Sequence, residues 1–274
     1  MKLLNALDFG IEQLRLHTES PEFEAVVLLK EASGRRTAEI LTNDTLKKVY
    51  FSKFQKYVRR RTIGEPLQYI IGRTNFLGVE IFINEETLIP RQETEFMTNY
   101  AIEGAKPIEN PKILEVGTGS GAIAISMAIN LPNSMVFASD ISKEALITCK
   151  RNIKYHHLEE RVFTVSADAL EPFKKDMQFD IIISNPPYIP KEDLLTLPEL
   201  VKKEPLIALN GGKNGVRIIN RLLRESPSLL KKNGIMYIEL SPSNIPYLRV
   251  PEELSYSIVN DQFGKKRILK ALRK

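Results

Sequence analysis

The sequence predicts an α/β fold in which a small helical domain precedes a doubly wound parallel sheet. From about residue 91 onward, short apolar runs that suit buried strands alternate with longer stretches of helical spacing. This alternation is typical of a parallel sheet with helices on both faces. The first sixty or so residues show helical spacing alone, and a short stretch with partly alternating apolar residues separates the two regions.

The N-terminal region is predicted to be a small helical domain spanning residues 1–73. Ser20 is a favourable N-cap residue and Pro21 suits the first helical position, so a helix is expected to begin there. Apolar residues then recur at helical intervals at Ala25, Leu28, Leu29 and Ala32, and again at Val49, Phe54, Tyr57 and Val58.

A hairpin and a sheet are predicted for the rest of the chain. Residues 74–90 are predicted to form a β-hairpin linker, because apolar residues alternate around a glycine there. Residues 91–274 are predicted to form the α/β domain. Its expected strands are residues 112–116, 135–139, 161–165, 180–184 and 235–240, and its expected helices are residues 121–131, 142–157 and 215–232.

Composition narrows the possible classes of protein. With 274 residues, of which 43% are hydrophobic, the chain can bury a normal core. No uncharged apolar run reaches transmembrane length, and acids occur within the first dozen residues, so we expect a cytoplasmic protein without a membrane partner. One cysteine, Cys149, and three histidines offer no ligand set of zinc spacing, so no metal is expected. A net charge of +5 is only a weak indication of nucleic-acid binding.

A glycine-rich turn connects the first strand of the sheet to an apolar helix in "ILEVGTGSGAIAI", residues 113–125. Gly117, Gly119 and Gly121 allow the backbone to turn sharply and approach a ligand at the helix N-terminus. A nucleotide-like ligand is therefore expected. With Ala122 the stretch also satisfies a loose dinucleotide pattern, so it does not distinguish a nicotinamide cofactor from S-adenosylmethionine. A turn that serves only close packing is the structural alternative.

Asp140 follows the second expected strand of the sheet. A carboxylate in this place can accept hydrogen bonds from both ribose hydroxyls of an adenosine. The alternative is that Asp140 is the N-cap of the helix that begins near Lys143.

The fourth expected strand ends in an unusual turn, "SNPPY", residues 184–188. Ligands of open α/β sheets bind beyond the carboxyl ends of the strands, so this turn should face the same pocket as the glycine turn. Pro186 and Pro187 have no N–H, and the Asn185 side chain adds a further carbonyl, so the turn presents acceptors and few donors. Such a turn suits an NH₂ group, against which the ring of Tyr188 can lie flat.

An amide or aryl amine nitrogen held in this way is predicted to attack an electrophilic methyl group. If Asn185 Oδ1 and the Pro186 carbonyl each hold one hydrogen, the nitrogen can pyramidalise and direct its lone pair at the methyl of a sulfonium. Positioning of this kind can contribute about 7–11 kcal/mol without a strong base. The structural alternative for the same residues is a rigid proline turn that ends a strand.

Five ordered stretches resemble the protein-(glutamine-N5) methyltransferases that act on peptide-chain release factors. They are "RRRTIGEPLQYIIGRTNFLGVEIFINEETLIPRQETE", "ILEVGTGSGAIAISMA", "FDIIISNPPYIP", "EPLIALNGGKNGVRIINRLL" and "DQFGKKRILKAL". The resemblance runs from about residue 59 to the C-terminus. It implies an N-terminal helical domain for substrate recognition, a β-hairpin and a Rossmann-like class I methyltransferase domain.

The resemblance also implies a role for each site residue. The residues implied in binding S-adenosylmethionine are Gly117, Thr118, Gly119, Ser120, Gly121, Asp140, Asp168, Ala169 and Asn185. The residues implied in holding the glutamine amide of a Gly-Gly-Gln loop are Asn185, Pro186, Pro187 and Tyr188, of which Asn185, Pro186 and Tyr188 are expected to be catalytic. The chain departs from the family pattern at Gln92, at Ala169 and in "IELSPSN", residues 238–244.

Two other functions are weighed against this one. A nucleic-acid adenine or cytosine amino methyltransferase shares the donor site and the Asn-Pro-Pro-Tyr turn, but it needs a surface that holds a flipped base, and no inserted recognition domain separates the motifs. No direct nucleic-acid substrate is therefore expected. A binding module on a decayed enzyme should have damaged glycines or a substituted Asn185, and these are intact. A basic run, Lys53 to Arg61, is expected to be the solvated end of a helix, and the alternative is a surface that contacts acidic release factor or ribosomal RNA.

Overall fold

The computed structural model describes residues 1–42, 44–174 and 176–274 and divides the chain into two compact units. The smaller unit comprises Met1–Arg73 together with Glu199–Lys203. The larger unit comprises Thr74–Pro198 and Glu204–Lys274. Within the described part of the chain, no helix is both long enough and apolar enough to cross a membrane.

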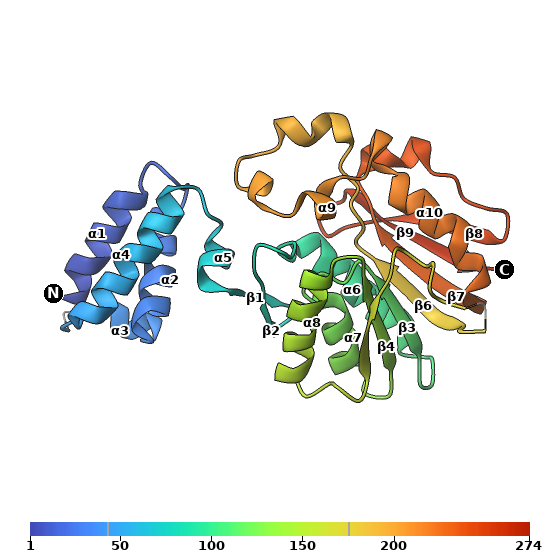
Figure 1. Ribbon diagram of the computed structural model, residues 1–274, viewed down its shortest axis with the longest axis horizontal. Helices are drawn as coiled ribbons and strands as arrows, with labels where there is room; N and C mark the ends of the chain where they lie inside the picture. Colours follow the sequence, from blue (N-terminus) through green and yellow to red (C-terminus); the bar gives the residue numbers. More distant parts are fainter. Residues whose placement is uncertain (43, 175) are drawn as a thin grey trace. The chain divides into compact units, whose positions relative to one another are not determined.

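The smaller unit is helical (Figure 1). Its helices are α1 (Leu3–Leu14), α2 (Pro21–Ser33), α3 (Thr37–Ile40), α4 (Lys48–Thr62) and α5 (Leu67–Ile71). Ser20 and Pro21 occupy the N-cap and first helical position of α2, as predicted. Leu28, Leu29 and Phe54 are fully buried where α1, α2 and α4 pack together. The prediction of a solvated basic run is wrong for Arg61, which is 4% exposed because its guanidinium pairs with the Glu24 carboxylate at 2.6 Å.

The predicted hairpin is present as strands β1 (Arg73–Phe76) and β2 (Val79–Phe82). Leu77 and Gly78 form the two-residue connection, with φ angles of 51° and 81°. Positive φ at both central residues is the signature of a type I′ turn, whose twist matches that of the paired strands.

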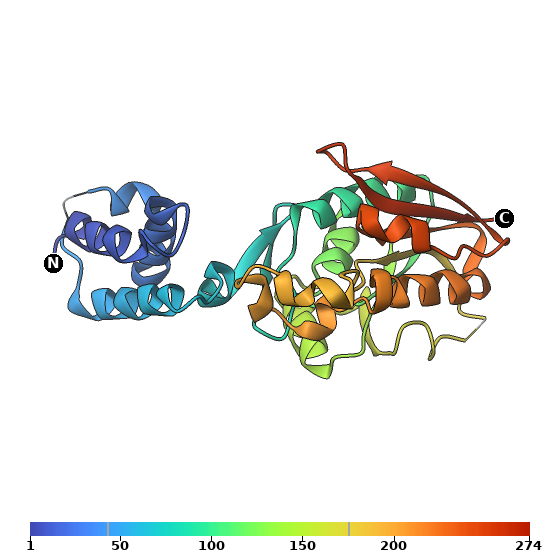
Figure 2. The ribbon, with the colours of Figure 1, turned by 90° about the horizontal axis from the view of Figure 1, so that it is seen from above.

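The larger unit contains a seven-stranded sheet in the order β5-β4-β3-β6-β7-β9-β8. Its strands are β3 (Lys112–Val116), β4 (Met135–Asp140), β5 (Val162–Ser166), β6 (Phe179–Ser184), β7 (Leu230–Glu239), β8 (Leu254–Asn260) and β9 (Lys266–Arg273). The five predicted strands are all present and are parallel to one another. The sheet is nevertheless mixed, because β9 runs antiparallel to both β7 and β8. Strands β8 and β9 are red in Figure 2.

The larger unit differs from the sequence predictions in two features. The antiparallel pair β8 and β9 was not predicted, because most of β8 is exposed and lacks the apolar run of a buried strand. The helix expected over residues 215–232 ends earlier, since α10 spans Arg217–Glu225 and a 3₁₀ turn, Ser226–Ser228, follows. Leu229 and Leu230 continue the helical apolar spacing, but Pro227 cannot continue the helix, and Leu230 instead begins β7 opposite Phe179.

Helices cover both faces of the sheet (Figure 1). The helices of the larger unit are α6 (Gln92–Ala105), α7 (Ala122–Asn130), α8 (Lys143–Tyr155), α9 (Leu206–Leu209) and α10. Leu114 of β3 and Ile182 of β6 pack in one cluster with Leu222 of α10. Because successive strand residues point to opposite faces, Ile113 and Ile181 point away from α10, toward the face that α6, α7 and α8 cover.

The sheet reverses its winding between β3 and β6. The chain passes from β3 outward to β4 and β5, then returns to the other side of β3 as β6. Val116 pairs with Ser139 of β4 and with Ser184 of β6, so the residues that follow these three strands begin at one level of the sheet. This is the crevice in which open α/β sheets bind ligands.

Candidate active site

A cavity of about 570 Å³ opens at the carboxyl ends of β3, β4, β5 and β6. Its volume lies in the usual range for small-molecule sites, roughly 300–1,000 Å³. The predicted site residues that line it are Gly117, Thr118, Gly119, Ser120, Asp140, Asp168, Ala169, Asn185, Pro186 and Pro187. Gly121 and Tyr188 are not among the lining residues. The fold therefore brings together the glycine turn and the Asn-Pro-Pro turn, as the sequence predicts.

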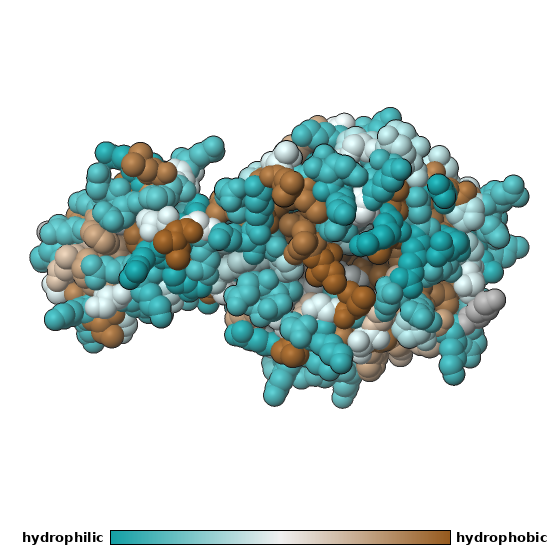
Figure 3. Space-filling view, turned by 45° about the horizontal axis from the view of Figure 1, so that its top comes forward, coloured by the Kyte–Doolittle hydropathy of each residue, from teal (hydrophilic) through white to brown (hydrophobic). Residues whose placement is uncertain are grey.

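The rim of the cavity is apolar on one side. Figure 3 shows a band of apolar surface across the larger unit. Ile141, after β4, and Ile207, in α9, both line the cavity, and each has more than half of its surface exposed, 53% and 57%. Large apolar side chains exposed next to a cavity commonly mark a surface that a ligand or partner covers.

The glycine turn needs its glycines for two different reasons. Gly117, Gly119 and Gly121 have φ angles of 75°, 53° and 86°, which side chains rarely tolerate. A Cβ atom at Gly121 would also lie 2.7 Å from Cys149 Sγ, so this glycine permits the close packing of the turn on α8. A Cβ at Gly119 would meet nothing within 4 Å, so Gly119 leaves its backbone open to the cavity.

Asp140 binds the glycine turn through its side chain. Its Oδ2 accepts a hydrogen bond from the Gly119 N–H at 2.8 Å, and its Oδ1 accepts one from the Ser142 N–H at 2.9 Å. The N-cap of α8 is Ser142, whose hydroxyl accepts from the Ala145 N–H, so the alternative reading of Asp140 as the N-cap is wrong. Burial raises the pKa of Asp140. Since a carboxylate has about four lone-pair sites, it retains capacity for two further donors.

Glu115 is a buried carboxylate that the sequence analysis did not single out. It lies in β3, is 1% exposed and lines the cavity. Its Oε2 accepts from the Thr118 hydroxyl at 2.6 Å and from the Ala124 N–H at 3.0 Å. Burial raises the pKa of Glu115 to about 8. The sequence feature that could have identified Glu115 is that it is a single charged residue at the otherwise apolar end of a strand.

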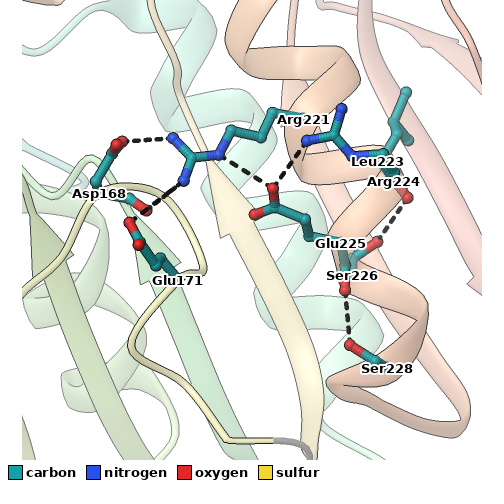
Figure 4. Close-up of polar contacts among 8 residues, drawn as sticks. All are labelled: Asp168, Glu171, Arg221, Leu223, Arg224, Glu225, Ser226 and Ser228. Atoms are coloured by element: carbon teal, nitrogen blue, oxygen red, sulfur yellow. Dashed lines mark hydrogen bonds and ion pairs between the residues drawn. The ribbon is translucent and has the colours of Figure 1, made fainter.

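Asp168 is held in place by α10 (Figure 4). Arg221 Nη1 donates to Asp168 Oδ1 at 2.6 Å, and Arg221 Nη2 donates to the Asp168 carbonyl at 3.0 Å. Arg221 Nε donates in turn to Glu225 Oε1 at 3.1 Å. Ala169 follows with a φ of 54°. The guanidinium thus fixes the side chain and the backbone of a cavity residue at a strained turn.

The Asn-Pro-Pro turn is positioned by side chains from distant parts of the chain. The Asn185 Nδ2 donates to Thr94 Oγ1 of α6 at 2.9 Å. The Thr94 hydroxyl donates to Glu239 Oε2 at 2.7 Å, and the Tyr188 hydroxyl donates to Glu239 Oε1 at 3.2 Å. The ring of Tyr188 packs on the core beside the sheet and does not line the cavity, whereas its hydroxyl, which had no predicted role, has a buried partner.

A second glycine-rich segment, residues 211–215, packs against the main-chain carbonyls of the same turn. A Cβ atom at Gly211 would lie 2.7 Å from the Pro187 carbonyl oxygen, and one at Gly215 would lie 2.0 Å from that of Tyr188. The buried Asn244 donates to the carbonyls of Tyr188 and Asn214, at 3.1 and 2.9 Å. Asn244 belongs to the "IELSPSN" stretch, so this departure from the family pattern contains a side chain that fixes the turn.

The loop before α6 is tied down by Glu204. The Ile89 N–H donates to Glu204 Oε2 at 3.0 Å, and Arg91 forms an ion pair with the other oxygen. The neighbouring residues Leu88 and Pro90 line the cavity. The helix α6 begins with Gln92 and not with a proline. Glu204 therefore fixes this wall of the cavity in the absence of a proline there.

Comparison with known proteins identifies close relatives over most of the chain. A family model described as methyltransferase small domain matches residues 98–204, and one described as PrmC N-terminal domain matches residues 5–72. A release factor glutamine methyltransferase of Chlorobaculum tepidum is 38% identical over 81% of this chain and 79% of its own length. The proteins of the same name from Rhodopirellula baltica and Moorella thermoacetica are 36% and 35% identical, over 92% and 88% of this chain and 89% and 86% of their own lengths.

Solved structures show the same fold at low sequence identity. The hMettl16 catalytic domain in complex with MAT2A 3'UTR hairpin 1 aligns with a TM-score of 0.55 and 16% identity, over 76% of this chain and 78% of that chain. This likeness concerns the fold alone. The larger unit has the Rossmann-like fold of class I methyltransferases, with a mostly parallel sheet between helices.

Proposed function

Because the chain belongs to the release factor glutamine methyltransferase family, we propose that its cavity binds S-adenosylmethionine at the glycine turn and the target glutamine at the Asn-Pro-Pro turn. The activity of the chain is the S-adenosylmethionine-dependent methylation of a glutamine in release factors. The observation that carries the site assignment is that one cavity is lined by both motifs.

The residues around the glycine turn suit S-adenosylmethionine. When bound, this molecule supplies an electrophilic methyl group on a positively charged sulfonium. The open backbone at Gly119 admits close approach, and Asp140 retains two lone pairs that can accept ribose hydroxyls. Glu115 places a carboxylate in a cavity that must hold a cation, which favours the ionised form of that carboxyl. Asp168 and Ala169 form a further wall of the donor site.

The residues around the Asn-Pro-Pro turn suit a primary amide. Asn185 Oδ1 and the Pro186 carbonyl accept one hydrogen each from the glutamine NH₂, and this leaves the nitrogen lone pair free to point at the methyl carbon. The N–C bond forms as the C–S bond breaks with its electron pair on sulfur, and one amide proton leaves to water. Pro187 shapes the turn, and the Tyr188 hydroxyl ties the end of the turn to Glu239.

Positioning is the main contribution of the protein to this reaction. An amide nitrogen is a weak nucleophile, and alignment of the two reactants can contribute about 7–11 kcal/mol. No strong base is required, because the nitrogen loses its proton only as the new bond forms. The acceptor geometry at Asn185 should therefore decide the rate more than the ionisation of any lining group.

We assign recognition of the intact release factor to the smaller unit. Every residue that lines the cavity belongs to the larger unit, so the helices of the smaller unit contribute no group to the reacting centre among the described residues. The cytoplasm, where release factors work, is the expected place of action.

A methyl-transfer assay with labelled S-adenosylmethionine tests the assignment. We expect label on release factor, no label on release factor in which the Gly-Gly-Gln glutamine is replaced by alanine, and no label on free nucleic acid. Label on the alanine-substituted release factor, or on nucleic acid alone, would overturn the proposed acceptor.

A further inference from the structure

We propose that Glu239 is a positioning residue for methyl transfer, because through the Thr94 hydroxyl it sets which end of the Asn185 amide faces the reacting centre. The proposal rests on the function proposed above for Asn185 Oδ1. Glu239 lies at the end of β7, is fully buried and does not line the cavity. It can affect the reaction only through the groups that it contacts.

The direction of the hydrogen bonds follows from the chemistry of the three groups. An ionised carboxylate only accepts, so the single proton of the Thr94 hydroxyl is directed to Glu239 Oε2. Thr94 Oγ1 can then only accept from its other neighbour, and the Asn185 group that donates is Nδ2. The amide oxygen of Asn185 must therefore face away from Thr94, and Asn185 lines the cavity.

The second oxygen of Glu239 fixes the other end of the same turn. Glu239 Oε1 accepts from the Tyr188 hydroxyl, three residues after Asn185. Among the residues that the structure describes, these two hydroxyls are the hydrogen-bond donors to the Glu239 carboxylate. One buried carboxylate thus organises both the first and the last residue of the Asn-Pro-Pro-Tyr turn.

The hydrogen-bond relay from Glu239 through Thr94 to Asn185 depends on the ionisation of Glu239. Burial raises the pKa of Glu239 to about 7, and the charge of Glu93 in α6 adds to this rise. The Thr94 and Tyr188 hydroxyls and the charge of Arg267 in β9 oppose the rise. Arg267 itself pairs with Asp261 at 3.5 Å. A protonated carboxyl gains an O–H that can donate to Thr94, which frees the Thr94 proton to point at Asn185 and favours the flipped amide. Activity should therefore fall as the pH falls through about 7.

The chain offers a matched set of substitutions to test the relay. Thr94→Val keeps the shape of the side chain and removes the hydroxyl, whereas Thr94→Ser keeps the hydroxyl. Thr98→Val is the control, since Thr98 is also buried, lies one turn further along α6 and donates only to the Thr94 carbonyl. Glu239→Gln replaces an acceptor-only group by one that also donates, so it can supply a proton to Thr94 Oγ1.

Single-turnover methyl transfer to release factor should be measured at saturating S-adenosylmethionine between pH 5.5 and 9. We expect Thr94→Val and Glu239→Gln to lower the rate on the order of tenfold, the factor that one ordinary hydrogen bond supplies. Thr94→Ser should recover most of the rate, and Thr98→Val should stay within about twofold of wild type, because no relay bond is lost. The dissociation constant of S-adenosylmethionine should be unchanged in Glu239→Gln and Thr98→Val, since neither residue lines the cavity.

The pH profile separates positioning from a structural effect. The wild type should lose rate below pH 7, and this acid limb should disappear in Glu239→Gln and in Thr94→Val. Equal rates for Thr94→Val and Thr98→Val, or an acid limb that survives in Thr94→Val, would overturn the proposal. If Glu239→Gln fails to fold, the comparison of Thr94→Val with Thr94→Ser decides alone. Failure of the underlying function would look different, because folded Asn185→Ala would then transfer methyl at the wild-type rate.

Discussion

The two ends of the cavity are held together by different kinds of contact. At the glycine turn the bonds span fewer residues, and two of the three have a main-chain N–H as donor. The Thr118 hydroxyl and the Ala124 N–H donate to Glu115, 3 and 9 residues away. The Gly119 N–H donates to Asp140, 21 residues away. At the Asn-Pro-Pro turn the bonds join side chains that are 91 and 145 residues apart, from Asn185 to Thr94 and from Thr94 to Glu239.

The difference indicates how each end can fail. At the glycine turn two donors are main-chain N–H groups but the acceptors are the Glu115 and Asp140 carboxylates, so the turn should be sensitive both to a changed backbone conformation and to the loss of either carboxylate. The Asn-Pro-Pro turn depends on single polar atoms of side chains, so the removal of one atom should change the rate without changing the fold.

The largest effect is expected from Asn185→Ala. Loss of a preorganised polar group commonly costs a factor on the order of 10²–10³ in rate, while the donor site should bind S-adenosylmethionine as before. Asn185→Asp keeps an acceptor oxygen but cannot donate to Thr94, so it should retain only part of the rate. Single-turnover methyl transfer measures the rate, and calorimetry measures the binding of S-adenosylmethionine. A folded Asn185→Ala variant with wild-type turnover would show that the turn is only structural.

Gly121→Ala should produce the next largest effect, on stability. The left-handed backbone costs an alanine about 1–2 kcal/mol, and the contact with Cys149 adds about 1–3 kcal/mol of overpacking. Gly119→Ala has the same backbone penalty without the contact, so it should lower the free energy of unfolding by less. Urea denaturation of the two variants compares them, and equal losses would contradict the packing argument.

Glu115→Gln should weaken binding of S-adenosylmethionine by roughly 10- to 100-fold, since a bond to a charged group is worth about 1.5–3 kcal/mol. The pKa of Glu115 is raised to about 8 in the free protein, and a bound cation favours the ionised carboxylate. Wild-type affinity should therefore rise as the pH rises toward 8, with release of a proton on binding below that pH. Calorimetry in buffers of different ionisation enthalpy detects this proton, and its persistence in Glu115→Gln would assign it elsewhere.

The smallest effect is expected from Arg221→Ala, which frees Asp168 from α10. The Arg221 side chain is 24% exposed, and ion pairs of this kind contribute about 0.2–1 kcal/mol, so the dissociation constant of S-adenosylmethionine should rise by at most about fivefold. Arg224→Ala is the control, because Arg224 is 72% exposed and contacts Glu225 but not Asp168. If the two variants bind S-adenosylmethionine with equal affinity, Arg221 does not support the donor site.

The elements that could be predicted from the sequence are those whose signals lie close together along the chain. The strand that leads into Gly117, the acid after the second strand and the Asn-Pro-Pro turn after the fourth each occupy a few consecutive residues. Covalent geometry fixes the relative positions of such neighbours, and the switch point of an open α/β sheet then brings the three strand ends together. The family resemblance followed from the same local stretches, and the relatives confirm it.

The side chains that support these motifs could be identified only from the folded structure. Glu239 is one of 34 acidic residues, and no spacing in the sequence connects it to Thr94 or Asn185. Asn244 and Arg221 likewise act on residues 56 and 53 positions away. The partner of such a side chain depends on which strand ends and helices the whole sheet places side by side. The antiparallel addition of β9 to β7, which the sequence did not predict, belongs to the same class of long-range contact.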